Sequence, residues 1–244
     1  MKGARGFALL AVLWVVVALG ALTAGAVAHA RADASVSGER VLRMRAHWAA
    51  EGCLQASLAA LDSARGSGGA FALDAADTIH YANGAACAVT AYDPASRLNL
   101  DSLGPTLRAR FDSLLRVDGD TSARQREALT TRYGSGRVNL NATSILGLAV
   151  LPGMTPAALR VIAEARQWRR PFTDMDDLLR RLPPDARSEV ANQYPELVGR
   201  LVFRTAALVL TAEGWQEGTR IVATIEAQVV DAGDRAALVE RRLW

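Results

Sequence analysis

The sequence predicts an α+β protein: a long N-terminal helix, membrane-spanning in its first half, packs on an antiparallel sheet that carries a large all-helical insert. Three observations predict this fold. Residues 7–28 are apolar and uncharged, and a helical period continues from there to residue 65. An Asn83-Gly84 turn between two short strand-like runs predicts a hairpin. Strict alternation of apolar residues returns only after residue 200, so residues 94–199 lie between strands.

The apolar run 7–28 has the length of a membrane span. It exceeds the roughly 7–15 apolar residues of a cleaved secretory signal and matches the roughly 20 residues that cross a bilayer as a helix. Lys2 and Arg5 precede it and predict that the leader stays cytoplasmic while the rest of the chain crosses the membrane. Ala28-His29-Ala30 has the small-x-small form of a signal peptidase site, so a cleaved export signal is the alternative.

Residues 29–65 predict the second half of the same helix. Val41, Met44 and Trp48, and then Leu54, Leu58 and Leu61, recur near helical spacing, and we expect this amphipathic half to find its apolar partner in the sheet. The helix is expected to end at the glycine-rich stretch 66–69, and residues 70–93 form the first hairpin.

The remaining chain divides into an insert and a C-terminal sheet. Residues 94–199 consist of short helical runs bounded by proline and glycine, which predicts an all-helical block. Residues 200–244 predict antiparallel strands, because apolar residues alternate from Ile221 to Val229 and glycine-containing turns lie on both sides.

Two cysteines, Cys53 and Cys87, fall on the predicted helix and the predicted hairpin. Cys53 is expected on the sheet-facing side of the helix, and Cys87 on the strand face that points back at it. If the chain is exported, the compartment is oxidising, and we predict a disulfide between them. The alternative is two buried free cysteines that pack as small hydrophobic residues.

Within the insert, residues 138–182 resemble a helix-hairpin-helix, a unit widely used to grip DNA phosphates. Pro152-Gly153 is expected to end the first helix and Thr155 to cap the second. Asn141 or Thr143 is expected to cap the first helix. A third helix is expected to begin at Thr173, with Asp176 completing a capping box.

DNA binding is the weaker interpretation of this segment. DNA-binding hairpins usually carry a second glycine where this chain has Thr155. Arg166, Arg169 and Arg170 can contact phosphate, but arginines at a helix C-terminus also complement the helix dipole. The chain carries 28 basic and 25 acidic residues, a balance that does not indicate a polyanion partner. We therefore expect a protein-facing or structural module and no nucleic acid.

Metal and enzyme signatures are weak. Asp118, Asp120 and Ser122 have the spacing of a calcium loop, but Ala123 and Leu129 replace the glycine and glutamate that such a loop needs, which favours a turn. The three histidines, at 29, 47 and 80, are scattered, and no nucleophile, phosphate or dinucleotide motif accompanies them. We expect no enzyme and no metal.

The beginning of the chain resembles that of type IV pilins and of the pseudopilins of type II secretion. Gly6 and Phe7, behind a basic leader and before an apolar helix, match the site where a prepilin peptidase cuts these proteins. The resemblance implies a leader of residues 1–6, a mature chain that begins at Phe7, and N-methylation of Phe7. Most members have a glutamate at the fifth mature residue, whereas this chain has Ala11.

The absence of that glutamate is typical of the K-type minor pseudopilin, general secretion pathway protein K, which also carries a large helical insert. Segments 97–103, 138–166 and 171–179 and the closing LVERRLW resemble recurrent K-type segments. The chain is short for this family, so part of the insert is expected to be trimmed.

The resemblance implies a single-pass protein of the bacterial inner membrane with its C-terminal domain in the periplasm. Its role would be to initiate or cap the type II secretion pseudopilus at the tip, for export of folded proteins. It implies I-type and J-type minor pseudopilins as partners, with secreted substrates or the outer-membrane channel as further contacts of the insert. It allows calcium in the insert but assigns no ligands. The alternative function is an exported helix-hairpin-helix DNA-binding protein.

Overall fold

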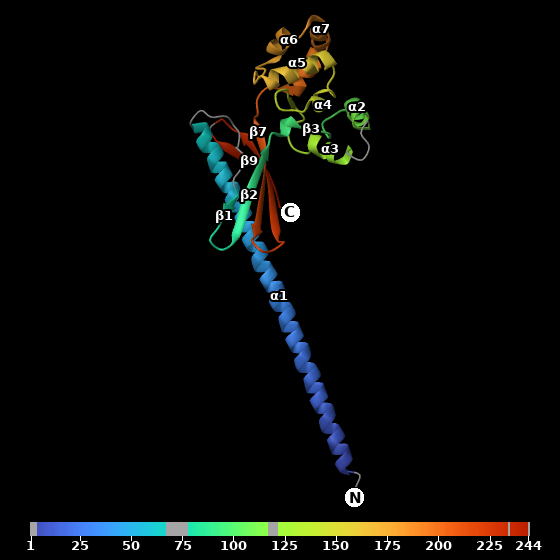
Figure 1. Ribbon diagram of the computed structural model, residues 1–244, viewed down its shortest axis with the longest axis vertical. Helices are drawn as coiled ribbons and strands as arrows, with labels where there is room; N and C mark the ends of the chain where they lie inside the picture. Colours follow the sequence, from blue (N-terminus) through green and yellow to red (C-terminus); the bar gives the residue numbers. More distant parts are fainter. Residues whose placement is uncertain (1–3, 67–77, 117–121, 234, 244) are drawn as a thin grey trace.

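The computed structural model describes residues 4–66, 78–116, 122–233 and 235–243. Helix α1 (Ala4–Gly66) is one uninterrupted rod that forms the long axis of the molecule. Its C-terminal part lies against a sheet, and the insert sits at the end of the sheet farthest from the N-terminus (Figure 1). The predicted α+β class and the long N-terminal helix are confirmed.

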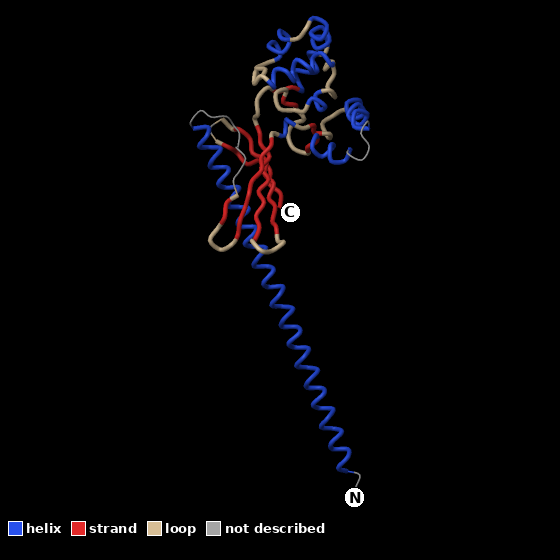
Figure 2. Tube along the Cα trace, in the orientation of Figure 1, coloured by secondary structure: helices blue, strands red, loops and turns tan. Residues whose placement is uncertain are grey.

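The sheet contains five antiparallel strands in the order β1-β2-β7-β8-β9. Strands β1 (Ile79–His80) and β2 (Ala85–Tyr92) form the predicted hairpin, in which Gly84 has the positive φ of 75° that such a turn requires. Strands β7 (Ala207–Gln216), β8 (Val222–Asp231) and β9 (Ala236–Leu243) form the predicted meander, shown with β2 in Figure 2. Strand β7 pairs with β2, so strands on either side of the insert are neighbours.

The contact between α1 and the sheet combines small helix residues, where the two come closest, with the fully buried Leu54 and Leu61. Ala46, Ala49 and Ala50 are almost fully buried there, against a sheet face whose buried residues include Ile225 and Val229. Because alanine side chains are short, the helix backbone comes close to the strands. At Gly214 of β7, an added Cβ would lie 2.1 Å from the carbonyl oxygen of Ala46, so only glycine fits.

The sheet-facing side of α1 differs in part from the prediction. Leu54 and Leu61 are fully buried in the core with the sheet, as expected. Val41, Met44 and Trp48 are exposed, with Trp48 at 64% of its full accessible surface. At their level the helix packs through alanines instead, because its close approach to the strands requires small side chains.

The insert contains seven α-helices and one short 3-10 helix among the described residues, and it is not all-helical as expected. Strands β3 and β4 form one parallel two-residue ladder and β5 and β6 another. Two-residue strands have no alternating pattern, so the sequence carries no sign of them. The elements of the insert, in chain order, are η1 (Pro94–Ser96), β3 (Leu98–Asn99), α2 (Pro105–Leu115), α3 (Ser122–Leu129), β4 (Thr130–Thr131), β5 (Val138–Asn139), α4 (Ile145–Leu148), α5 (Pro156–Gln167), α6 (Met175–Arg181), α7 (Pro184–Asn192), α8 (Tyr194–Arg200) and β6 (Leu201–Val202).

The insert also extends beyond residue 199. Leu201–Val202 pairs with Val138–Asn139 and not with the main sheet, whose next strand begins at Ala207. The insert has a hydrophobic core of its own, separate from the core between α1 and the sheet, and its fully buried members include Phe111, Ile162 and Phe172. The molecule thus has two cores, one per structural unit.

Two of the expected helix caps are displaced by a residue. Thr155 caps α5 as predicted, accepting a hydrogen bond from the amide of Ala158. Helix α4 is capped by Ser144 rather than Asn141 or Thr143, and α6 by Asp174 rather than Thr173. Asn141 and Thr143 instead bond across the insert, where the Thr143 hydroxyl donates to the carbonyl of Ala95.

Candidate assembly surface

The N-terminal part of α1 is apolar and bare. In the span that begins at Val12, the most apolar window has a mean hydropathy of 2.0 and none of it is buried against the rest of the chain. Within the described residues, α1 is the one helix that is long enough and apolar enough to cross a membrane. The helix continues without a break through residues 28–30, the alternative cleavage site.

An exposed apolar stripe continues along α1 beyond the span. Val41, Met44 and Trp48 are 44%, 56% and 64% exposed and follow the spacing of one helix face. We call these three residues the α1 stripe. It lies away from the alanine-rich face that packs on the sheet. Because it prolongs an apolar span on the same rod, the α1 stripe is a candidate surface for packing against another helix.

The candidate residues at the beginning of α1 lie at the edge of what the structure describes. The helical backbone includes Gly6, Phe7 and Ala11, but their side chains lie outside the described part. Cleavage between Gly6 and Phe7, methylation of Phe7 and the assembly role of Ala11 therefore stay predictions.

Cys53 and Cys87 form the disulfide expected from the sequence, with their Cα atoms 6.1 Å apart. The two residues are 2% and 0% exposed, in the core between α1 and the sheet. Cys87 pairs in register with Gly214, the glycine on which α1 rests. The hydroxyl of Tyr81 lies 3.6 Å from the Cys87 sulfur and covers the bond from the hairpin side. The disulfide thus joins α1 covalently to the centre of its contact with the sheet.

The helix-hairpin-helix segment faces its own insert. The guanidinium of Arg166 donates hydrogen bonds to the carbonyls of Leu140 and Thr143, and burial lowers its pKa. An added Cβ at Gly153 would lie 3.1 Å from the carbonyl oxygen of Glu189 in α7, so the hairpin turn packs against that helix. An inward arginine and a covered turn do not form the phosphate cradle of a DNA-binding hairpin.

The other two arginines of that segment are exposed at the end of α5. Arg169 adopts a left-handed φ of 51°, a position usually taken by glycine. The amides of Arg169 and Arg170 donate to the carbonyls of Arg166 and Ala165, at 3.0 and 2.8 Å, and close the helix. These arginines therefore terminate α5, and their guanidinium groups stay at the surface.

The candidate metal residues are not brought together by what the structure describes. Asp118 and Asp120 lie outside the described residues, as does the side chain of Ser122. Among the described residues, no group of three or more histidine, cysteine or acidic side chains is arranged to hold a metal ion. His80 lies 2.7 Å from a carboxylate oxygen of Glu217, an exposed pair across the hairpin end of the sheet.

Sequence reasoning missed the polar junction that positions the insert on the sheet. The carboxylate of Glu226 on β8 accepts hydrogen bonds from Tyr133, at 2.8 Å, and from Arg132. Burial raises the pKa of Tyr133, which keeps its hydroxyl a donor. At the base of the insert, Asp93 accepts from Asn139 and Thr205, both at 2.8 Å. These partners are far apart in the chain, and no local pattern pairs them.

Comparison with known proteins identifies the architecture. No protein-family model matches the sequence, and no curated protein sequence matches it. The chain is similar in structure to a chain of the GspK-GspI-GspJ complex from the type 2 secretion system of enterotoxigenic Escherichia coli, with a TM-score of 0.61 and 12% sequence identity. The likeness covers 86% of this chain and 99% of that one. At this identity the likeness establishes the fold alone, over nearly the whole length of that chain.

Proposed function

We propose that this chain is a K-type minor pseudopilin that takes part in assembling a type II secretion pseudopilus. The observation that carries the proposal is the interruption of the helix-and-sheet unit, between the paired strands β2 and β7, by an insert with its own core. The fold likeness to a chain of the type 2 secretion complex, which covers 86% of this chain, supports the proposal. The K-type features of the sequence, above all Ala11, agree with it.

The proposed place in the cell follows from α1. The span that begins at Val12 crosses the inner membrane, and the sheet and the insert lie in the periplasm. A prepilin peptidase cuts between Gly6 and Phe7, and the new amino terminus at Phe7 is methylated. The proposed role is mechanical and requires neither catalysis nor a cofactor. Calcium in the insert is left without assigned ligands.

The proposed partners are the I-type and J-type minor pseudopilins. The related structure is a complex of GspK with GspI and GspJ. In this chain the α1 stripe (Val41, Met44 and Trp48) supplies an apolar surface for another helix just beyond the membrane span. The insert is wide and lies at the end of the molecule away from the membrane, which fits a subunit at the tip (Figure 1). Secreted substrates or the outer-membrane channel are its proposed further contacts.

The absence of a carboxylate at Ala11 supports a position at the tip. In pilin-like filaments the usual glutamate is thought to pair with the amino terminus of the subunit ahead. A subunit with no neighbour ahead has no such amine, and an unpaired acidic side chain in the membrane costs at least about 2.5 kcal/mol on insertion scales. We expect Ala11→Glu to leave cleavage and folding intact and to bring no gain in secretion. Repeated incorporation of this variant along the filament would contradict the tip role.

Mass spectrometry of the mature protein from its own membrane tests the proposal most directly. We expect a chain that begins at N-methylated Phe7. A chain that begins at Arg31 would identify a cleaved export signal and would reject the pseudopilin assignment. Co-purification with the I-type and J-type subunits tests the partners: Met44→Glu should weaken it, whereas the matched change Leu238→Glu, on the exposed strand β9, should not.

A further inference from the structure

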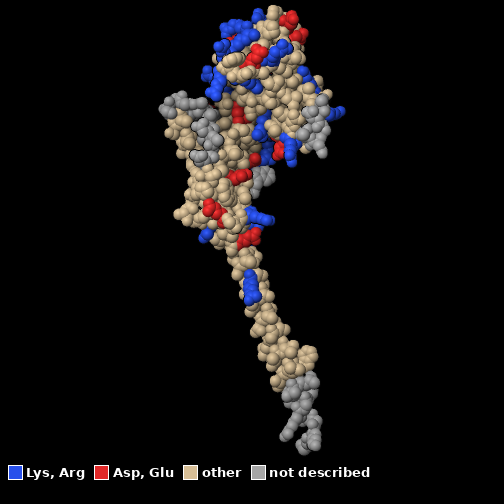
Figure 3. Space-filling view, in the orientation of Figure 1, with Lys and Arg blue, Asp and Glu red and all other residues tan. Residues whose placement is uncertain are grey.

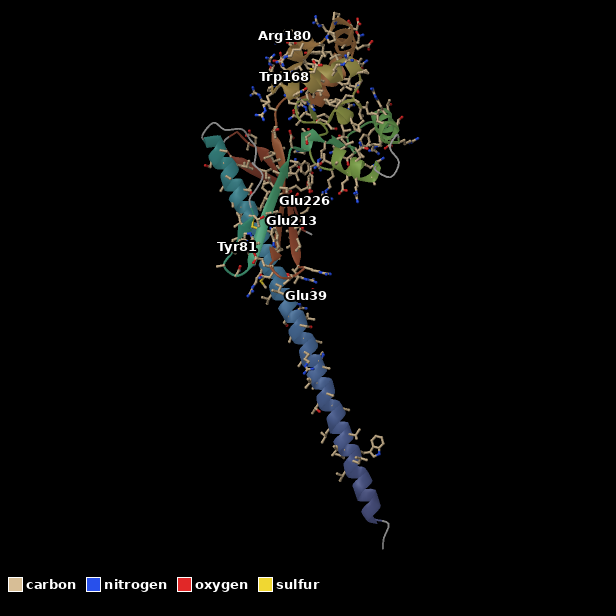
Figure 4. All side chains as sticks on the ribbon, in the orientation of Figure 1. Glu39, Tyr81, Trp168, Arg180, Glu213 and Glu226 are labelled. Carbon is tan, nitrogen blue, oxygen red and sulfur yellow. A yellow bond between two sulfur atoms is a disulfide. The ribbon has the colours of Figure 1, made fainter. Side chains whose placement is uncertain are left out.

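A pocket on the insert combines an exposed tryptophan with arginines. It lies beside the C-terminal end of α5 and beside α6, has a volume of about 680 Å³, and we call it the α5–α6 pocket. Trp168 is 71% exposed, more than any other large apolar residue that the structure describes. Figure 4 shows Trp168 and Arg180 on the same side of the insert. The lining residues are Val161, Glu164, Ala165, Trp168, Arg170 and Arg181.

Two of the polar groups at this pocket, on Trp168 and Arg170, are unused donors among the described residues. Arg181 is held in place by Asp177, at 2.6 Å, and by the carbonyl of Arg170, at 3.0 Å, while its guanidinium lies 4.7 Å from the centre of the Phe172 ring. Within the described part of the chain, the Arg170 guanidinium has no hydrogen-bond or ion-pair partner, and the same holds for the Trp168 indole N–H. A ligand rich in acceptors would satisfy both.

The charge of the surface favours an anionic ligand. Asp177 is the shared partner of Arg180 and Arg181, so one of these two cations is not neutralised by it. Arg169 and Arg170 add two more positive charges at the end of α5. Figure 3 shows Lys and Arg atoms gathered over this part of the insert.

The same pocket argues for a peptide rather than a nucleic acid. Val161 and Ala165 give it an apolar side, which suits an aliphatic or aromatic side chain. Glu164 lies in the lining, where it would repel a continuous phosphate backbone but is tolerated by a peptide whose carboxylates are spaced apart. Arg166, which could have extended a phosphate track, is bonded inward.

We propose that the α5–α6 pocket docks an acidic peptide segment of a partner protein, with a carboxylate on Arg170 and an apolar or aromatic side chain stacked on Trp168. Guanidinium groups bind carboxylates in a two-pronged geometry, and tryptophan and arginine are the residues on which binding energy at interfaces concentrates. The proposal concerns the surface of the insert and goes beyond the pseudopilin role; it holds whether or not the chain ends a filament.

The test uses the full chain in detergent micelles and fluorescence anisotropy of three labelled probes: a short peptide of alternating Glu and Phe, the same peptide with Lys for Glu, and a single-stranded DNA of equal length. We expect the acidic peptide to bind at least about tenfold more tightly than either of the others. Arg170→Ala and Trp168→Ala should each weaken its binding about tenfold, and Trp168→Phe, which keeps an aromatic face, should weaken it less.

Two control variants distinguish binding at the α5–α6 pocket from non-specific effects of positive charge and of aromatic side chains. Arg110→Ala removes an exposed arginine from α2, and Trp14→Ala removes an exposed tryptophan from the membrane span of α1. Neither should change binding of the acidic peptide. Equal binding of the acidic and basic peptides would overturn the proposal, as would unchanged binding by Arg170→Ala. Tighter binding of DNA than of the acidic peptide would assign the pocket to nucleic acid.

Discussion

Replacing Gly214 with alanine should loosen the contact between α1 and the sheet. The added Cβ would lie 2.1 Å from the Ala46 oxygen and 2.4 Å from the Ala50 nitrogen, and both are backbone atoms that cannot rotate away. Ordinary contact begins at 3.4 Å, so α1 has to move from β7 by about 1.3 Å. Overpacking costs about 1–3 kcal/mol where side chains can adjust. Because only the backbone can yield here, we expect the upper end, about 3 kcal/mol.

Thermal unfolding of the full chain in detergent measures this cost. For a protein of this size, about 3 kcal/mol lowers the Tm by about 6–12 °C. Gly199→Ala is the matched control: it makes the same change in helix α8, where a Cβ meets nothing within 4 Å, and it should leave the Tm unchanged or raise it slightly. A Tm of Gly214→Ala within about 1 °C of the parent would refute the close contact as described.

Four further outcomes test other parts of the structure. Replacing Cys53 and Cys87 together with alanine should cost about 4 kcal/mol in the chain-entropy model, and thiol labelling of the unfolded, unreduced parent should find no free cysteine. Hydrogen bonds from backbone amides lower the pKa of Asp174. The stabilising contribution of its carboxylate is therefore present above the ordinary pKa of 3.8 and is lost as the pH falls through the lowered pKa. Asp174→Asn keeps the cap and should flatten the fall in Tm below about pH 4. Tyr133→Phe removes a hydrogen bond to a carboxylate worth about 1.5–3 kcal/mol and should make the insert cleave faster in limited proteolysis, with the sheet unaffected. Arg166→Met should lower the free energy of unfolding by at least about 1–3 kcal/mol, because two buried carbonyls lose their hydrogen-bond donor. In a mobility-shift assay the parent should show no specific binding of duplex DNA, so this change should remove none.

The sequence predicted the elements that have a long regular period. The helix of α1 and the meander from Ala207 to Leu243 each repeat a pattern over several residues, and each was located within a few positions. The hairpin at Gly84 was located by its Asn-Gly turn. The pairing of Cys53 with Cys87 followed from the same periods, because a residue's face on a helix or strand is fixed by its spacing.

What the sequence did not predict depends on close approach or on distant partners. Next to the α1 stripe, the buried face of α1 consists of alanines, which carry little hydrophobic signal, so the exposure of the stripe was not predicted. The two-residue ladder between β5 and β6 and the bond from Tyr133 to Glu226 join segments far apart in the chain, and neither leaves a local pattern. Thr143 and Ser144 are adjacent, and both residue types can cap a helix. The Thr143 hydroxyl donates a hydrogen bond to the carbonyl of Ala95, a contact distant in the chain, and Ser144 caps α4.

The α1–sheet contact shows how a long helix can transmit force to a small sheet. A rod that is free over its first half acts as a lever, and any sideways load on it is resisted where it meets β2 and β7. At that place Ala46, Ala50 and Gly214 allow the backbones to approach closely, and further along the helix Leu54 and Leu61 bury larger apolar side chains in the same core. The disulfide to Cys87 lies in register with Gly214, so the place where the helix approaches the sheet closely is also held covalently. Under the proposed function the same rod is pulled by its neighbours in a filament, and a bond at this position would keep the sheet attached while the α1 stripe stays free to pack against another helix.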